Sequence, residues 1–137
     1  MKIILTNMCM IYSNNQILVQ NRIKNDWPGI NFPGGHVENN EDIDCSVIRE
    51  IKEETGLTLK EVECVGAINW LDEENDIRHL CILYRSNKFE GQLISSNEGE
   101  MLWISLKDVD KYPQSIDFDK VLKKCLIGLE GVLDYEN

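Results

Sequence analysis

A helical repeat of apolar residues, bounded by glycines, constrains this sequence more than any other feature. Apolar side chains recur at every fourth position from 42 to 55, with one more beside them: Ile43, Val47, Ile48 and Ile51. On an α-helix this spacing gathers the side chains into one stripe that can pack on a core. We therefore expect an amphipathic helix over residues 42–55.

The two ends of this expected helix also carry signals. Asn39 or Asn40 can cap the N-terminus, and Gly56 stands where a helix commonly closes in the left-handed conformation. The residues around the first turn suit the positive end of the helix dipole because they are acidic: Glu41, Asp42 and Asp44.

Three carboxylates share one side of this helix. Glu50, Glu53 and Glu54 fall within an arc of roughly 100°, so we expect them to converge. Like charges at this spacing weaken a helix, whereas Mg²⁺ prefers oxygen ligands and would reverse the interaction. Arg49 can orient one or more of these carboxylates, with Glu41 as its alternative partner. The competing interpretation is a solvated acidic helix face.

The rest of the chain reads mainly as strands. The expected elements are a hairpin of residues 2–13 and 17–23, a loop over 24–38 with one short strand, antiparallel strands over 59–71 and 77–89, a strand over 100–106, and an amphipathic helix over 118–129. This order favours an α/β architecture in which helices cover a mixed sheet. At 137 residues, the chain fits one domain, residues 1–137.

Charge and composition restrict the partners. The formal net charge of -10 repels nucleic-acid backbones and anionic membranes, so we expect neither polymeric nucleic acid nor a membrane as partner. A phosphate-containing ligand would need a bridging divalent cation. No apolar run approaches a membrane span, and we expect a cytoplasmic protein. The five cysteines show no C-x-x-C pair and are expected to be buried free thiols.

The spacing of the glycine, arginine and glutamate residues around the acidic face resembles the signature of a known protein family. Gly35, Glu41 and the run Arg-Glu-Ile-Lys-Glu-Glu-Thr-Gly-Leu at 49–57 look like the complete signature of the Nudix hydrolases, and Phe-Pro-Gly-Gly at 32–35 is also similar. The resemblance implies a Nudix-type α/β/α sandwich with a mixed β-sheet between helices. It also implies that Mg²⁺, or Mn²⁺, binds against the diphosphate of a nucleotide substrate. Arg49 and Glu41 would support the loop and the helix.

Site roles follow from the same resemblance, position by position. Glu50, Glu53 and Glu54 would hold or orient the metal, and Gly34 would add its backbone carbonyl as a ligand. Glu50 would also position or deprotonate the attacking water. Gly34 and Gly35 would bring backbone groups close to the substrate, although a simple turn is compatible with the same residues.

Residues outside the motif leave alternatives open. Family members often use a later acidic residue as ligand or base, and Glu98 is favoured over Glu100 because Glu100 can already lie within a strand. Arg22 resembles an upstream arginine that contacts phosphate; the alternative is a surface arginine. His36 is read as a loop histidine and His79 as structural.

Aromatic residues could stack on a nucleobase, although most are expected in the core: Trp27, Phe32, Trp70 and Trp103. Trp27, beside Pro28, is the favoured ligand contact.

Several absences narrow the substrate. The chain has no SQPWPFPxS array, no proline between Pro33 and Pro113 and no tyrosine between Tyr12 and Tyr84. These absences disfavour branches that act on NADH, ADP-ribose and diadenosine polyphosphates. The chain then looks like the MutT-like branch, which cleaves nucleoside triphosphates, including oxidised ones such as 8-oxo-dGTP. Other nucleoside diphosphate derivatives and a non-catalytic nucleotide-binding module are the alternatives; a monomer and a homodimer both stay open.

Overall fold

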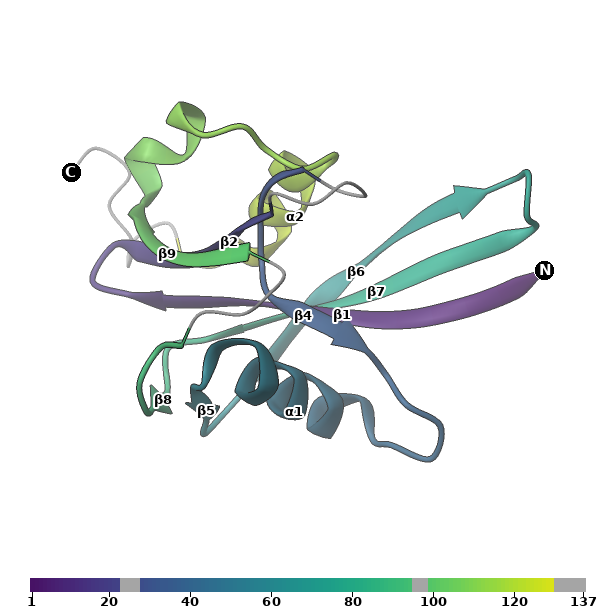
Figure 1. The fold of residues 1–137 in the computed structure, drawn as a ribbon, viewed down its shortest axis with the longest axis horizontal. Coiled ribbons are helices and arrows are strands. Elements are labelled where there is room, and N and C mark those ends of the chain that lie inside the picture. The colour runs from purple at the N-terminus through teal and green to yellow at the C-terminus, as the bar shows by residue number, and fades with distance from the viewer. Residues whose placement is uncertain (23–27, 95–98, 130–137) are drawn as a thin grey trace.

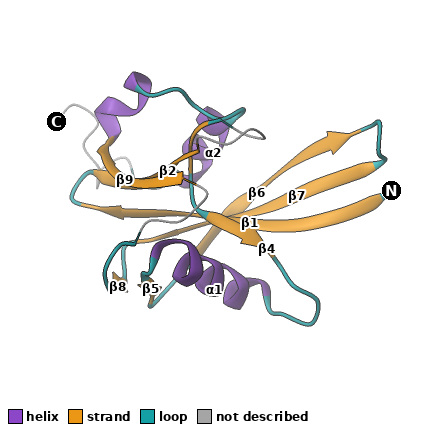
Figure 2. Cartoon of the chain, in the orientation of Figure 1, coloured by secondary structure: helices purple, strands orange, loops and turns teal. Residues whose placement is uncertain are grey.

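The computed structural model describes residues 1–22, 28–94 and 99–129, in which strands dominate and helices lie at the sides (Figures 1 and 2). In chain order, the elements are β1 (Lys2–Ser13), β2 (Gln16–Arg22), β3 (Gly29–Asn31), β4 (Gly34–His36), α1 (Ile43–Thr55), β5 (Thr58–Leu59), β6 (Glu63–Asp72), β7 (Ile77–Ser86), β8 (Phe89–Glu90), β9 (Gly99–Ser105), the 3₁₀ helix η1 (Leu106–Lys111) and α2 (Phe118–Cys125).

The main sheet is mixed, and β1 lies at its centre. Its strand order is β3-β2-β1-β7-β6, with β4 also paired to β1 and β9 to β2. β1 runs parallel to β7 from Lys2 to Ile11, while the other described pairs in this sheet are antiparallel. β1 and β2 form the expected hairpin but pair only next to the turn. On the same edge of β1, residues Thr6 to Met8 therefore pair with β4, while β7 pairs along the opposite edge.

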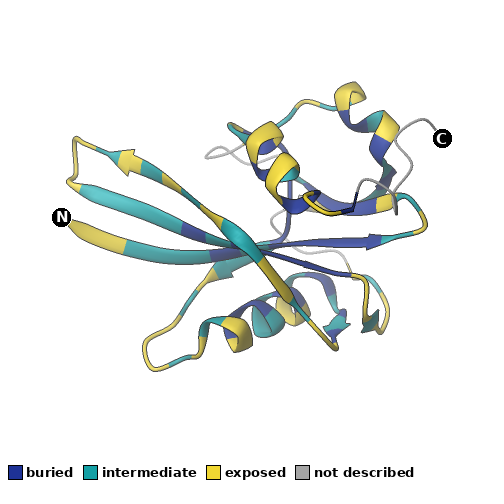
Figure 3. Ribbon diagram, turned by 180° about the vertical axis from the view of Figure 1, so that it is seen from behind, coloured by how far each residue is buried: buried dark blue, intermediate teal, exposed yellow. Residues whose placement is uncertain are grey.

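Alternation along β1 builds two hydrophobic layers. Cys9 and Ile11 pack in the cluster that contains α1, whereas Met10 and Tyr12 pack in the cluster that contains α2. This follows because successive side chains of a strand point to opposite faces. The two helices lie on opposite sides of the sheet, and the buried residues gather between them (Figures 1 and 3). The expected α/β/α sandwich with a mixed sheet is confirmed.

The acidic-motif helix forms nearly where it was predicted, but its N-terminal cap differs. Neither Asn39 nor Asn40 is the cap. Asp42 is, because its backbone is extended and its carboxylate accepts a hydrogen bond from the Cys45 N–H at 3.2 Å. Gly56 closes the helix with φ of 83°, as predicted.

The structure corrects the expected loop and the expected burial of all five cysteines. The loop over 24–38 contains two short strands among its described residues, β3 and β4, instead of one. Cys45 and Cys64 are exposed rather than buried, because they lie on the outer face of α1 and on the outermost strand β6. No helix in residues 1–22, 28–94 or 99–129 is long and apolar enough to cross a membrane.

A buried arginine fastens the end of α2 to the sheet. Arg85 on β7 donates from Nη1 to the carbonyl of Cys125 at 3.0 Å and to that of Ile127. Its other side binds the carboxylate of Glu63 at 2.9 and 3.2 Å. These contacts lower the pKa of Glu63, mainly through the hydrogen bond from Arg85.

We predict that Arg85→Met lowers the free energy of unfolding by about 2–3 kcal/mol, because two carbonyls lose their charged donor. Urea unfolding measures the change. Glu63→Gln is the matched control and should cost much less, since the Glu63 side chain is mainly exposed. Because the folded-state pKa of Glu63 is lowered, its contribution is present at neutral pH and is lost on acidification. A Glu63→Gln variant as destabilised as Arg85→Met would contradict this account.

Candidate active site on the acidic helix

Arg49 organises the acidic face of α1. Its Nε and Nη2 donate to the two carboxylate oxygens of Glu41 at 2.7 and 3.0 Å, and Nη2 also donates to the carbonyl of His36 at 3.0 Å. Nη1 donates to Glu50 at 2.9 Å and to Glu53 at 3.2 Å. These contacts match the five N–H donors of a guanidinium, a planar fork that lysine does not offer. Both partners considered from the sequence, the helix carboxylates and Glu41, are therefore used.

The same contacts shift the ionisation of the site. The hydrogen bond from Arg49 lowers the pKa of Glu41, and the paired carboxylates raise the pKa of Arg49. Burial raises the pKa of Glu50, although the hydrogen bond and charge of Arg49 act against this shift. Burial thus disfavours the charged form of Glu50, whereas the Arg49 hydrogen bond favours the charged form of Glu41.

Two glycines allow the loop to approach α1 and β1 closely. A Cβ on Gly35 would lie 2.3 Å from the carboxyl carbon of Glu50, so the missing side chain leaves a space that this carboxylate fills. A Cβ on Gly34 would lie only 2.0 Å from the backbone oxygen of Asn7. Any side chain at 35 would displace a flexible carboxylate, whereas any side chain at 34 would collide with a strand backbone.

The oxygen donors of this region fit a hard divalent cation. Glu50, Glu53 and Glu54 lie on α1, and the carbonyl-bearing Gly34 lies on β4, which packs against the helix. In the described parts of the chain, no three acidic, histidine or cysteine side chains already surround a common point, so the expected convergence is not reached. Glu50 and Glu53 both accept hydrogen bonds from Nη1 of Arg49. Mg²⁺ does not require a closed protein cage, because it keeps waters and shares substrate phosphates.

A cavity of about 360 Å³ opens beside the glycines. Strands β1 to β4, β6 and β7 contribute its lining: Thr6, Asn7, Met8, Gln20, Arg22, Asn31, Phe32, Gly34, Gly35, His36, Trp70 and His79. This size is typical of a small-molecule site, and polar groups mix with aromatic ones as such sites require.

The cavity brings together residues that lie far apart in the sequence. Arg22 is half-buried, and its Nε is buried without a hydrogen-bond partner among the described residues. His36, at the end of β4, and His79, on β7, both line the cavity, and their roles stay predictions. Trp70 and Phe32 contribute aromatic rings to the lining of the cavity. Trp70 is oriented by a 2.7 Å hydrogen bond from its indole N–H to Asp117.

Other candidates lie elsewhere. Trp103 stacks on Phe89, with ring centroids 5.7 Å apart, and does not line the cavity. Glu100 is exposed within β9, as the sequence suggested it could be. Trp27 and Glu98 lie outside the described residues, so their roles stay predictions.

Sequence reasoning missed three amides, Asn7, Gln20 and Asn31, which are buried in strands and line the cavity. Their signal was available, because each interrupts a run of strand residues that is otherwise suited to a core. A buried amide is costly unless it is hydrogen-bonded or faces a ligand.

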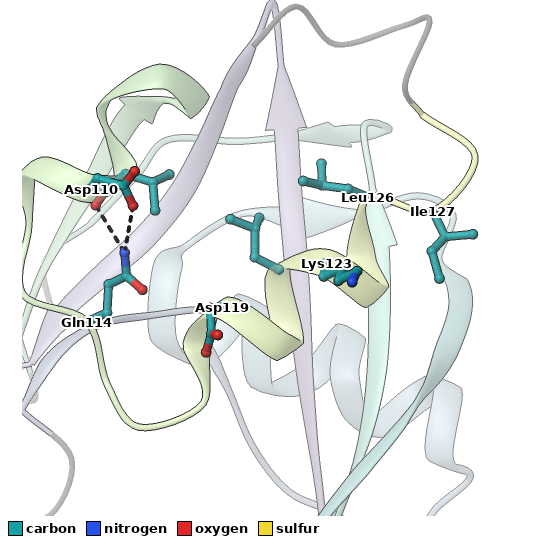
Figure 4. A pocket seen from close by; sticks show the side chains of 8 residues that line it. Asp110, Gln114, Asp119, Lys123, Leu126 and Ile127 are labelled. Atoms are coloured by element: carbon teal, nitrogen blue, oxygen red, sulfur yellow. Dashed lines mark hydrogen bonds between the residues drawn. The ribbon is translucent and has the colours of Figure 1, made fainter.

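A second hollow of about 340 Å³ lies where η1 meets α2, with Asp110, Gln114, Asp119 and Lys123 around it (Figure 4). All of its lining residues come from positions 109–127, and none belongs to the acidic motif. The first cavity is therefore the candidate active site.

We predict opposite outcomes for alanine at the two glycines. Gly35→Ala should leave thermal stability nearly unchanged but reduce kcat by about 100-fold, because the Glu50 carboxylate must move by an ångström or more. Gly34→Ala should lower the free energy of unfolding by about 1–3 kcal/mol. Its Cβ would collide with the backbone of β1, which cannot move without disturbing the sheet. Thermal unfolding and kcat, measured on both variants, provide the check; equal stability losses would contradict the assigned close contacts.

The fold and motif agree with known proteins. A NUDIX domain profile matches residues 4–125. An ADP-ribose pyrophosphatase from Methanocaldococcus jannaschii is 30% identical over 124 residues, which cover 89% of this chain and 72% of that protein. A MutT Nudix hydrolase from Burkholderia pseudomallei superposes with a TM-score of 0.80 at 21% identity, covering 90% of this chain and 98% of that one. For a MutT protein from Bacillus halodurans, the TM-score is 0.77 at 26% identity, with 91% and 82% covered. The chain therefore belongs to the Nudix hydrolases, a family of pyrophosphohydrolases that bind nucleotides and typically use a divalent metal.

Proposed function

We propose that this protein is an Mg²⁺-dependent pyrophosphohydrolase of nucleoside triphosphates, including oxidised ones such as 8-oxo-dGTP, and that Mn²⁺ can replace Mg²⁺. Water attacks one phosphorus, the phosphoanhydride bond breaks, and the products are a nucleoside monophosphate and pyrophosphate. The observation that carries the proposal is the cavity whose wall includes Gly34, Gly35 and His36, directly beside the carboxylates of α1.

The acidic helix supplies the proposed metal ligands. Glu50, Glu53 and Glu54 would hold the cation together with the carbonyl of Gly34. When bound, the cation neutralises phosphate charge and makes a bound water more acidic. Glu50 would also position or deprotonate the attacking water, as the family resemblance implies, and burial raises its pKa. Arg49 would keep Glu50 and Glu53 in place without entering the chemistry.

The cavity would hold the nucleotide. Arg22 brings a guanidinium whose Nε lacks a partner among the described residues, which suits contact with a phosphate. Trp70 and Phe32 offer aromatic surface for a base, and the amides of Gln20 and Asn31 offer donors and acceptors for its edge. Further contacts from Trp27 and a further ligand or base at Glu98 remain part of the proposal.

ADP-ribose is the second candidate substrate, because the relative from Methanocaldococcus jannaschii carries that activity in its name at 30% identity. Both substrates present a diphosphate to the metal, and they differ in the group attached to it. A non-catalytic nucleotide-binding module is disfavoured, because Glu50, Glu53, Glu54 and Arg49 are all present in the sequence.

We predict that Glu54→Gln lowers kcat at least 100-fold with Mg²⁺, because a lost charged ligand removes several kcal/mol of transition-state stabilisation. Initial rates of pyrophosphate release measure this effect, and circular dichroism checks the fold. Glu73→Gln, in the exposed turn between β6 and β7, is the matched control and should retain full activity. Undiminished metal-dependent turnover by Glu54→Gln would remove Glu54 from the ligand set.

Substrate choice is tested by kcat/KM for 8-oxo-dGTP, dGTP, the other triphosphates and ADP-ribose. We expect at least one triphosphate to exceed ADP-ribose by about tenfold or more, a difference of roughly 1.4 kcal/mol in transition-state binding. The products, separated by anion exchange, should be a monophosphate and pyrophosphate. Higher kcat/KM for ADP-ribose would favour the second candidate, and binding without turnover of any substrate would favour the non-catalytic module.

A further inference from the structure

A buried asparagine links the glycine strand to the acidic helix. Asn7 lies in β1 with only 2% of its surface exposed, on the strand face that α1 covers. Its neighbours on that face, Cys9 and Ile11, are buried residues of the α1 cluster. An apolar residue at position 7 would continue the row of buried apolar side chains on this face. Burying an amide there costs free energy unless the amide is hydrogen-bonded.

Both ends of this amide are hydrogen-bonded. Oδ1 of Asn7 accepts the backbone N–H of Gly35 at 3.1 Å, and Nδ2 donates to Oγ of Ser46 at 2.9 Å. The Ser46 hydroxyl in turn donates a hydrogen bond to the carbonyl of Ile43 at 2.6 Å. A backbone N–H can only donate, which fixes the orientation of the Asn7 amide. Asn7 therefore ties Gly35 to the first turn of α1.

This contact sets the direction of a carbonyl. The N–H of Gly35 and the C=O of Gly34 belong to one peptide unit, which is trans, so the two groups point in opposite directions. Holding the N–H toward Asn7 consequently aims the Gly34 carbonyl away from it. Glycines on both sides of this peptide restrain its rotation little by themselves, so the pairing of β4 with β1 and the hydrogen bond from Gly35 to Asn7 supply the restraint.

We infer that Asn7 is a positioning residue that orients the Gly34 carbonyl for the divalent cation, with Ser46 as its anchor on α1. The inference rests on the proposed function, which assigns that carbonyl to the metal. Asn7 touches neither the cation nor the substrate phosphates in this role. It makes the backbone ligand on β4 and the carboxylate ligands on α1 parts of one rigid unit.

The test measures Mn²⁺ binding to metal-free protein by electron paramagnetic resonance, without turnover. Asn7→Leu, which keeps the branching of the side chain and removes both hydrogen bonds, should weaken Mn²⁺ binding by about tenfold or more, as loss of a ligand-orienting partner typically does. Ser46→Ala should weaken it less, because Oδ1 still meets Gly35. In the metal-free protein, the amide resonance of Gly35 should shift, and its hydrogen exchange should accelerate, in Asn7→Leu.

Ser86→Ala is the control for a general structural effect. Ser86 on β7 is also buried and bridges backbone groups, accepting the N–H of Lys88 and donating to the carbonyl of Glu61, but it lies away from the acidic motif. Its loss should lower thermal stability without changing Mn²⁺ affinity or the Gly35 amide.

Mn²⁺ binding by Glu54→Gln distinguishes failure of the Asn7 role from failure of the metal site itself. If Glu54→Gln loses Mn²⁺ affinity while Asn7→Leu keeps it within about twofold, the role of Asn7 is wrong and the metal site stands. If neither variant loses affinity, the metal site itself is wrong and the inference falls with it. Should Asn7→Leu fail to fold, Ser46→Ala decides: a weakened affinity supports the inference, and an unchanged affinity overturns it.

Discussion

The Arg49 guanidinium holds the acidic helix, the loop before it and the glycine strand in one arrangement. Carboxylates crowded on one helix face repel one another and destabilise a bare helix. Arg49 offsets that repulsion with hydrogen bonds to Glu41, Glu50 and Glu53, and its contact with the carbonyl of His36 attaches the end of β4. Only a planar donor fork can serve these directions at once. The acidic motif is thereby stable before any cation binds.

Close packing of glycine against backbone and carboxylate gives the site its shape. Gly34 lies against the backbone of β1, and Gly35 lies against the carboxylate of Glu50, in both cases where a Cβ would not fit. The buried amide of Asn7 then connects this glycine pair to Ser46 on the helix. Strand, loop and helix thus meet in close contact, which suits a site that must hold oxygen ligands within a fraction of an ångström.

The proposed polyanionic substrate must overcome the negative charge of the protein. The net charge of -10 repels a nucleotide at long range, and the carboxylates of α1 add to that repulsion locally. A divalent cation on those carboxylates reverses the local sign, and Arg22 adds a positive group in the cavity wall. In the proposed function, recognition of the base falls to the cavity residues on β2, β3 and β6, which lie outside the acidic motif.

Local patterns in the sequence were sufficient for α1, the hairpin, the β6–β7 pair and the acidic face, because each depends on periodicity or on spacing within one segment. The N-terminal cap was assigned wrongly because several acidic and amide residues compete there, and only the backbone angles select Asp42. The same limit applies to the cavity. Trp70, His79 and the buried amides come from strands far apart in sequence, and the parallel pairing of β1 with β7 brings those strands together.

The sequence by itself therefore determined the family, the fold class and the identity of the acidic residues, since these are written in short-range spacing. Tertiary structure decided what those residues contact. It directed Glu50 and Glu53 to Arg49, placed the Glu50 carboxylate where Gly35 lacks a side chain, and tied Gly35 to Asn7. Such contacts depend on how β1, β4 and α1 pack in space, and no periodicity within a single segment encodes that packing.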